Sequence, residues 1–205
     1  MDDTVAVALF RHGLTEANKS HAYLGWTDSP LCPEHKNKLA PAHQGYRRIF
    51  ASDLGRCMKT AAILFPDHSI EPCPEWREMH FGEWEGRTYQ ELKDNEAYQK
   101  WLEDPFSGVL PGGESFASFT ARVDKGWQNL TDQLLQGNNR DAAIITHGGV
   151  IKYLLVKYAP EQKEFWEWQV PFGRGYELRW TREAFRRGER CTSLQEAGLT
   201  GSPNG

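Results

Sequence analysis

The chain has 205 residues, of which 39% are hydrophobic and 25% charged, as expected for one globular domain with its own core. Its net charge of −4 excludes a global positive field that would recruit nucleic acid or anionic lipid, so any anionic ligand needs a local cluster of cations. Because the chain opens on Met1-Asp2-Asp3 without a signal-like apolar run, and no stretch reaches membrane-spanning length, we expect a cytoplasmic protein.

The predicted elements alternate along the chain. Apolar runs predict strands at 4–10, 48–52, 70–74, 142–147 and 175–180. Helical spacing of apolar residues predicts helices at 55–65, 88–103, 115–135 and 149–158, with Thr88 and Ser115 as N-caps. Segments 21–45 and 104–114 are expected to be loops, and 175–195 a β-hairpin. This order favours an α/β layered fold with a largely parallel sheet.

Three of these strands end in side chains suited to binding phosphate. Arg11-His12-Gly13 follows the first strand, and His147-Gly148 follows the run at 142–146. The second strand ends at Ser52, and Arg56 comes shortly after it. Because ligands bind at the carboxyl ends of the strands in open α/β sheets, we expect two histidines and two arginines to meet in one cleft. A local cationic site is therefore predicted although the net charge is negative.

The same segments carry a family resemblance. LFRHGLTEAN at 9–18, SDLGRCMKTA at 52–61, REMHFGEWEG at 77–86, PGGES at 111–115 and ITHGGV at 145–150 stand in this order along most of the chain. Together they resemble the histidine phosphatase superfamily, also called the phosphoglycerate mutase-like fold. The resemblance implies a three-layer α/β/α sandwich with a largely parallel central sheet.

The resemblance also implies covalent catalysis through phosphohistidine. His12 would attack phosphorus as a neutral imidazole, with its other ring nitrogen donating to a backbone carbonyl. Arg11 and Arg56 would clamp the phosphoryl oxygens with forked donors, and His147 would donate a hydrogen bond to the phosphate. A solvated Arg56 paired with Asp53 is the alternative for that arginine.

Further site residues follow from the same motifs. Glu78 would be the general acid, because a carboxyl group beside an anionic phosphate is favoured in its protonated form. Glu83 and Glu85 are the rival carboxylates and are otherwise expected to be surface charges. The backbone N–H of Gly148 at a helix start, and the side chain of Asn18, are expected to bind phosphate.

The substrate is less well defined by the sequence. HFGEWEGRTYQEL at 80–92 and the segment 23–31 resemble the phosphatase branch, especially broad-specificity and α-ribazole phosphatases. Gly25 and Trp26 are candidate substrate-binding residues, with Trp26 stacking on a flat substrate or else packing its loop onto the domain. The alternatives are a cofactor-dependent phosphoglycerate mutase and a weakly catalytic phosphate-binding module. Ala17 stands where many relatives have Trp, and segment 32–44 is divergent.

The remaining expectations concern organisation and partners. One domain is expected over 1–195 with cap elements at about 88–114, and a flexible tail over 196–205. The four cysteines, Cys32, Cys57, Cys73 and Cys191, are expected to be reduced thiols. Neither a metal nor a cofactor is expected, although His35 and His43 fall in the divergent segment. The expected partner is a small-molecule phosphate ester, not nucleic acid or membrane, and a homodimer is left open.

Overall fold

A computed structural model describes residues 3–42, 45–137 and 139–197. Its centre is a sheet in the order β3-β2-β4-β1-β5-β6. The first four strands of that order are parallel to one another, whereas β5 pairs antiparallel with both β1 and β6, so the predicted largely parallel sheet is confirmed. The strands are β1 (Thr4–Arg11), β2 (Arg48–Ala51), β3 (Ile70–Pro72), β4 (Asp141–Thr146), β5 (Gly175–Thr181) and β6 (Ser193–Ala197).

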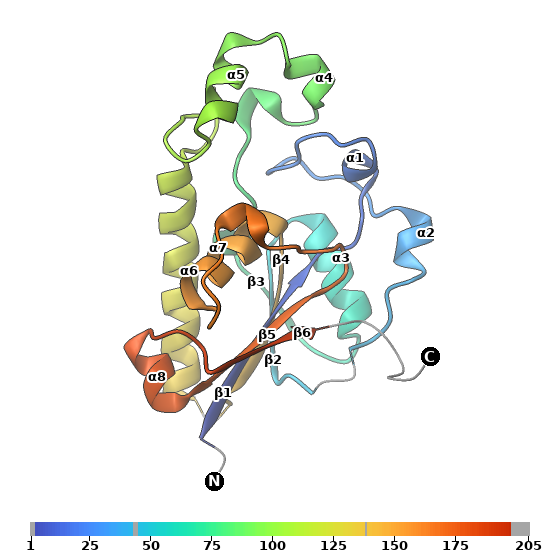
Figure 1. The fold of residues 1–205 in the computed structure, drawn as a ribbon. Helices are drawn as coiled ribbons and strands as arrows, with labels where there is room; N and C mark the ends of the chain where they lie inside the picture. The colour runs from blue at the N-terminus through green and yellow to red at the C-terminus, as the bar shows by residue number, and fades with distance from the viewer. Residues whose placement is uncertain (1–2, 43–44, 138, 198–205) are drawn as a thin grey trace.

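Helices cover both faces of this sheet, as the three-layer sandwich requires (Figure 1). Helices α6 (Phe116–Gln136), α7 (Gly148–Tyr158) and α8 (Arg182–Arg187) lie on one face, and α3 (Gly55–Leu64) lies on the other. The short helices are α1 (Glu16–Lys19), α2 (Pro33–Lys36), α4 (Tyr89–Leu92) and α5 (Glu96–Glu103). Three 3-10 turns complete the described elements: η1 (Pro74–Trp76), η2 (Gly82–Trp84) and η3 (Phe165–Glu167).

The alternation of side chains along β1 creates two separate cores. Val5, Val7 and Leu9 pack into the larger core together with residues of α6 and α7. Ala8 and Phe10 face the other way, into the core beneath α3. Because both faces of the central strands are covered, they read as continuous apolar runs, and this rigid double-sided core fixes the strand ends that carry the site.

The cap lies beyond the carboxyl ends of the strands and is built from two helices (Figure 1). The single helix predicted at 88–103 is wrong, because α4 ends at Leu92 and α5 begins anew at Glu96. Asn95 causes the restart, since its side chain accepts the N–H of Tyr98 at 3.0 Å and caps α5. Thr88 does form the predicted N-cap, through a capping box.

The C-terminal region differs from its prediction in two ways. β5 and β6 pair antiparallel, but α8 stands between them, so the segment is not a simple hairpin. β6 also extends two residues into the predicted tail, where Glu196 pairs with Tyr176 and Ala197 with Gly175. Positions 198–205 lie outside the described residues. Among the helices that are described, none is both long and apolar enough to span a bilayer.

Candidate active site

Three strand ends meet at the carboxyl edge of the sheet. In the register of the parallel pair β1 and β4, Arg11 stands opposite Thr146, so His12 and His147 follow side by side. Their ring centroids lie 5.1 Å apart, and both rings are buried. The structure therefore brings together the histidines that the sequence predicted to meet.

His12 is held as a neutral imidazole. Its Nδ1 lies 2.7 Å from the carbonyl oxygen of Gly13, which can only accept, so Nδ1 carries the proton and Nε2 carries the lone pair. Burial lowers the pKa of His12 well below its usual value, and the nearby charges of Arg56 and Arg11 lower it further. This is the protonation state that a nucleophilic histidine needs.

Arg56 is fully buried at the start of α3. Its Nη1 donates to the carbonyl of Thr27 at 2.9 Å and its Nη2 to that of Gly25 at 2.5 Å. The ion pair with Asp53 that the sequence left open is wrong, because Asp53 instead accepts two hydrogen bonds from Arg77. Arg56 is thus a buried, pre-oriented cation beside the histidines.

Arg11 supplies a second guanidinium. Its Nη1 donates to the carbonyl of Val170 at 2.7 Å, and its Cζ lies 3.6 Å above the ring of Phe172. Burial lowers the pKa of Arg11 to about 10, although the charge of Glu78 opposes this and favours the cation. The buried Nε atoms of Arg11 and Arg56 have no hydrogen-bond partner among the described residues. Such donors suit an anionic ligand.

His147 is also neutral, but its ring nitrogens are already engaged. Its Nε2 lies 2.9 Å from the hydroxyl of Ser52, and its Nδ1 lies 3.3 Å from Nη2 of Arg56. Because a guanidinium only donates, Nδ1 accepts and Nε2 carries the proton. Burial lowers the pKa of His147 well below its usual value, with Arg56 adding to the effect. A direct bond from His147 to phosphate, as predicted, would need Arg56 to release Nδ1.

Glu78 lies where it contacts the start of α7. Its Oε2 accepts the N–H of Gly149 at 2.9 Å, and its Oε1 accepts that of Met79 at 3.1 Å. A Cβ atom added to Gly149 would stand 2.3 Å from Oε1, so glycine is what allows this close approach. The predicted general acid thus lies near Arg11, and its charge raises the pKa of that arginine.

Of the two rival carboxylates, Glu85 has a structural role. It accepts the backbone N–H of Trp26 at 2.7 Å and that of Thr27, and its side chain is only 7% exposed. The expectation that Glu85 is a surface charge is therefore wrong: it holds the 25–27 loop. Glu83 is exposed.

A cavity of about 790 Å³ opens beside Arg11 and Glu78, whereas the buried His12, Arg56 and His147 are not among its described lining residues. One end is polar and is formed by Arg11, Glu78, Lys152 and the backbone of Gly148 and Gly149. The rest is mostly an aromatic wall, formed by Trp101 and Phe106 of the cap, Phe116 and Phe119 of α6, Phe165 and Trp166 of η3, and Tyr23 and Phe81 from two loops. A phosphate at the polar end would leave room for a large flat group along this wall.

Three predicted substrate contacts lie elsewhere. Trp26 is absent from the described lining of the cavity, and its indole N–H donates to the carbonyl of Glu78 at 2.9 Å. Gly25 presents its carbonyl to Arg56. Asn18 accepts the hydroxyl of Thr15 at 2.8 Å through Oδ1. Trp26 and Gly25 thus make contacts within the protein, whereas Tyr23 reaches the cavity. Substrate binding by Trp26, Gly25 and Asn18 stays a prediction.

Sequence reasoning missed Ser52, Gly149, Lys152 and Phe172 as site residues. Lys152 had a detectable signal, because it lies three positions after Gly149 and so shares its helix face. Phe172 had none, since it comes to Arg11 from a loop far along the chain.

In the divergent segment, His35 accepts the N–H of Leu14 at 3.2 Å, and His43 lies outside the described residues. No cluster of three potential metal ligands occurs in the part of the chain that is described.

Comparison with known proteins places this site in a family. Residues 7–189 match the histidine phosphatase superfamily (branch 1). The chain belongs to this superfamily. It is 33% identical over 161 residues to the adenosylcobalamin/alpha-ribazole phosphatase of Salmonella typhimurium, covering 73% of this chain and 77% of that protein. It is 31% identical over 153 residues to the probable phosphoglycerate mutase GpmB of Serratia proteamaculans, covering 69% of each.

Solved structures of this superfamily share the fold. The alpha-ribazole phosphatase from Shigella flexneri superimposes with a TM-score of 0.75 at 26% identity, over 84% of this chain and 89% of that one. A putative alpha-ribazole-5′-P phosphatase from Escherichia coli gives a TM-score of 0.82 at 22% identity, over 95% of this chain and 96% of that one. The fold is therefore phosphoglycerate mutase-like, as the resemblance implied.

Proposed function

We propose that this chain is a phosphomonoesterase that hydrolyses small-molecule phosphate esters through a phosphohistidine on His12, without a metal or an organic cofactor. The observation that carries the proposal is the state of His12: a buried, neutral imidazole whose lone pair is on Nε2, flanked by two guanidinium groups. Those cations supply the charge that a transferring phosphoryl group needs. We propose the cytoplasm as its location.

In the first step, Nε2 of His12 attacks phosphorus and the bond from phosphorus to the ester oxygen breaks. Arg11 and Arg56 bind the phosphoryl oxygens, where their Nε groups lack protein partners. The leaving oxygen takes a proton from Glu78, which lies at the polar end of the cavity. The products are phosphohistidine and a free alcohol.

In the second step, water attacks phosphorus and the bond from nitrogen to phosphorus breaks. Glu78, now ionised, accepts the proton of the attacking water and regains the form it began with. The electron pair returns to Nε2 of His12, and inorganic phosphate leaves. Dividing the reaction in this way replaces direct attack of water on the ester with two easier displacements.

We further propose an α-ribazole phosphatase-like preference. The Salmonella typhimurium relative supports it, and so does the aromatic wall, because a flat ring system stacks on such side chains. Phosphoglycerate mutation is the second candidate, favoured by the relative from Serratia proteamaculans and by Lys152, which adds a cation to the same cavity.

Phosphate release in EDTA tests the proposal. The substrates are p-nitrophenyl phosphate, α-ribazole 5′-phosphate and a panel of alkyl phosphates, with His12→Ala as the control and interconversion of phosphoglycerates assayed in parallel. We expect metal-independent release that His12→Ala abolishes, with α-ribazole 5′-phosphate the best substrate. Interconversion without release would favour the mutase, and phosphate binding without turnover would leave only a binding module.

A further inference from the structure

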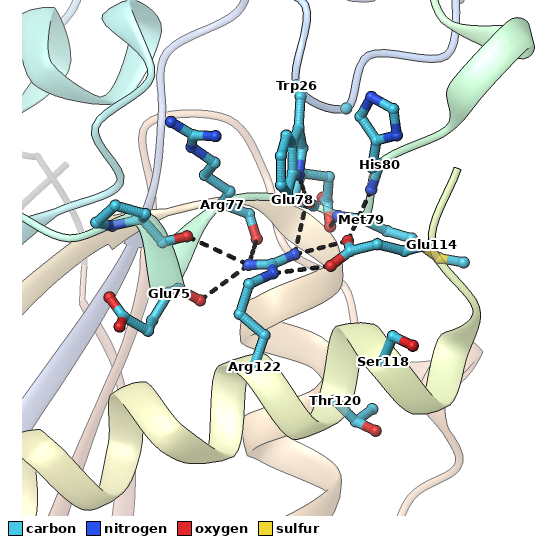
Figure 2. A network of polar contacts seen from close by, with 12 residues as sticks. Trp26, Glu75, Arg77, Glu78, Met79, His80, Glu114, Ser118, Thr120 and Arg122 are labelled. Atoms are coloured by element: carbon cyan, nitrogen blue, oxygen red, sulfur yellow. Dashed lines mark hydrogen bonds and ion pairs between the residues drawn. The ribbon is translucent and has the colours of Figure 1, made fainter. Parts of the chain in front are cut away.

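The segment that carries Glu78 is held by one arginine from α6. Nη1 of Arg122 donates to the carbonyls of Glu75 at 3.0 Å and Arg77 at 2.9 Å, and Nη2 donates to that of Glu78 at 3.1 Å (Figure 2). A longer contact of 3.4 Å reaches Pro74. Pro74 and Glu75 belong to η1, whereas Arg77 and Glu78 lie in the irregular stretch that follows it, where their carbonyls have no strand partner to fix them.

The same guanidinium is oriented by a carboxylate from the PGGES motif. Glu114 accepts from Nε of Arg122 at 2.9 Å and from Nη2 at 2.8 Å, a forked pair in which both side chains are largely buried. Oε2 of Glu114 also accepts the backbone N–H of His80 at 3.0 Å. Figure 2 shows Glu114 and Arg122 together spanning the backbone on both sides of Glu78.

Two glycines, Gly113 of this motif and Gly82 of the loop after Glu78, allow the two loops to lie backbone against backbone. The backbone N–H of Glu114 donates to the carbonyl oxygen of His80 at 2.9 Å. A Cβ atom on Gly113 would stand 2.4 Å from the carbonyl of His80, and one on Gly82 would stand 2.1 Å from that of Pro111. Residues 111–114 are thus fixed to the loop that follows Glu78.

Among the described residues, the carboxylate of Glu78 itself is held by two backbone N–H groups, those of Gly149 and Met79. Its main-chain carbonyl, in contrast, accepts from both Arg122 and the indole of Trp26 at 2.9 Å. The position of the carboxylate relative to His12 therefore depends on how firmly this backbone is held. A misplacement of about 1 Å in a reacting group can reduce turnover by about a hundredfold.

We propose that Arg122, oriented by Glu114, is a positioning residue that sets the place of Glu78 as the proton donor to the leaving group. This inference rests on the proposed function, since it takes Glu78 as the acid. Arg122 touches neither His12 nor the cavity in the described structure. Its effect on the leaving-group dependence of the reaction is expected to pass through Glu78, which makes it separable from a general effect on folding.

Leaving-group dependence is the readout that a merely structural role would not change. We compare kcat/KM for p-nitrophenyl phosphate with that for the best alkyl phosphate of the panel, in Arg122→Met and Arg122→Lys. Nitrophenolate departs without needing a proton, so misplacing Glu78 should affect it little. We expect Arg122→Met to lower kcat/KM about 30-fold for the alkyl ester but less than about threefold for the nitrophenyl ester, since general acid catalysis contributes about 10²–10⁴.

Arg122→Lys is the conservative variant and should recover part of the alkyl activity, because lysine keeps the pair with Glu114 but cannot fork across the carbonyls. Arg182→Met is the matched control. Arg182 also donates to a backbone carbonyl, that of Leu135 at 3.0 Å, but it lies on α8, at the opposite end of the sheet from the cap (Figure 1). We expect it to change thermal stability without changing the ratio of the two activities.

A double variant separates this proposal from the one it rests on. In the Glu78→Gln background, Arg122→Met should cause no further selective loss on alkyl esters, because the proton donor is already absent. Equal losses on both substrate types in Arg122→Met, or a further selective loss in the double variant, would overturn the positioning role. If Glu78→Gln alone shows no leaving-group selectivity, the assignment of Glu78 fails instead.

Discussion

The rings of His12 and His147 lie edge to face at 5.1 Å between centroids, both rings are buried, and the guanidinium of Arg56 contacts the ring of His147. Each ring is fixed in one tautomer by its own partner, the carbonyl of Gly13 for His12 and the guanidinium of Arg56 for His147. Two neutral imidazoles beside a buried cation form an arrangement that disfavours protonation of either ring.

The stability of the protein should fall as the pH falls below about 6.5, the usual pKa of histidine. Burial lowers the pKa of His12 and of His147 in the folded state, so the unfolded chain binds more protons in this range and acid favours unfolding. Each such proton lowers the free energy of unfolding by about 1.4 kcal/mol per pH unit. Urea denaturation between pH 7 and pH 5 measures this slope.

The variant His12→Gln should reduce the slope of the free energy of unfolding against pH by the contribution of one proton, about 1.4 kcal/mol per pH unit. His35, whose pKa is also lowered by burial, is unchanged in the variant and cancels in the comparison. A slope that is identical in both proteins would show that His12 is not held neutral, contrary to the account of the nucleophile.

Arg56→Lys should lower kcat/KM by about 10²–10³, the range found when one preorganised donor to a developing charge is removed. Lysine keeps the charge but cannot hold the carbonyls of Gly25 and Thr27 while also pointing a second donor at phosphate. Arg48→Lys is the control, because Arg48 pairs with Glu71 in β3, away from the carboxyl edge. Steady-state kinetics on p-nitrophenyl phosphate measures both, and similar activities in the two variants would argue against the phosphoryl clamp.

Lys152→Met should raise KM more than it lowers kcat. Lys152 is half-buried in the cavity wall, with Nζ 5.1 Å from the ring centroid of Trp166, and both burial and the charge of Arg11 lower its pKa. Losing one partly screened attraction to an anionic substrate, worth about 1 kcal/mol, raises KM about fivefold. Lys157→Met, on the same helix but paired with Asp124, should leave KM unchanged. A loss confined to kcat would place Lys152 in the chemical step instead.

Gly25→Ala should destabilise the fold and displace Arg56. A Cβ atom there would stand 2.3 Å from the carbonyl oxygen of Met79 and 3.0 Å from the backbone nitrogen of Phe81, neither of which can rotate away. Overpacking of this kind costs about 1–3 kcal/mol. Gly45→Ala is the control, because a Cβ atom added at Gly45 would have no neighbour within 4 Å among the described residues. Thermal unfolding of the two variants should therefore differ, and equal melting temperatures would contradict the close packing of the 25–27 loop.

The sequence predicted the parts of the site that depend on local pattern. Apolar runs ending in Arg11 and in His147 are enough to place these residues at strand ends, and strand parallelism then brings them together. Trp26 shows where such reasoning stops, because nothing local distinguishes an indole that stacks on substrate from one that donates to the carbonyl of Glu78. The contact of Phe172 with Arg11 likewise depends on a distant loop.

The cap likewise combines features that local sequence predicts with features that it does not. The N-cap at Thr88 is a local signal that the sequence predicts, whereas the restart of the helix at Asn95 is hidden within an apparently continuous helical pattern. The role of PGGES in holding the Glu78 segment needs Arg122, which comes from the following helix and from no motif that the sequence singled out.

Trapping the phosphoenzyme tests the central claim most directly. The protein is mixed with a radiolabelled phosphate ester, quenched in alkali, where phosphohistidine survives, and the label bound to protein is counted after washing. We expect alkali-stable, acid-labile label on the wild type and none on His12→Ala. Label that persists on His12→Ala, or turnover of the wild type with no trapped label at any time, would contradict a phosphohistidine on His12.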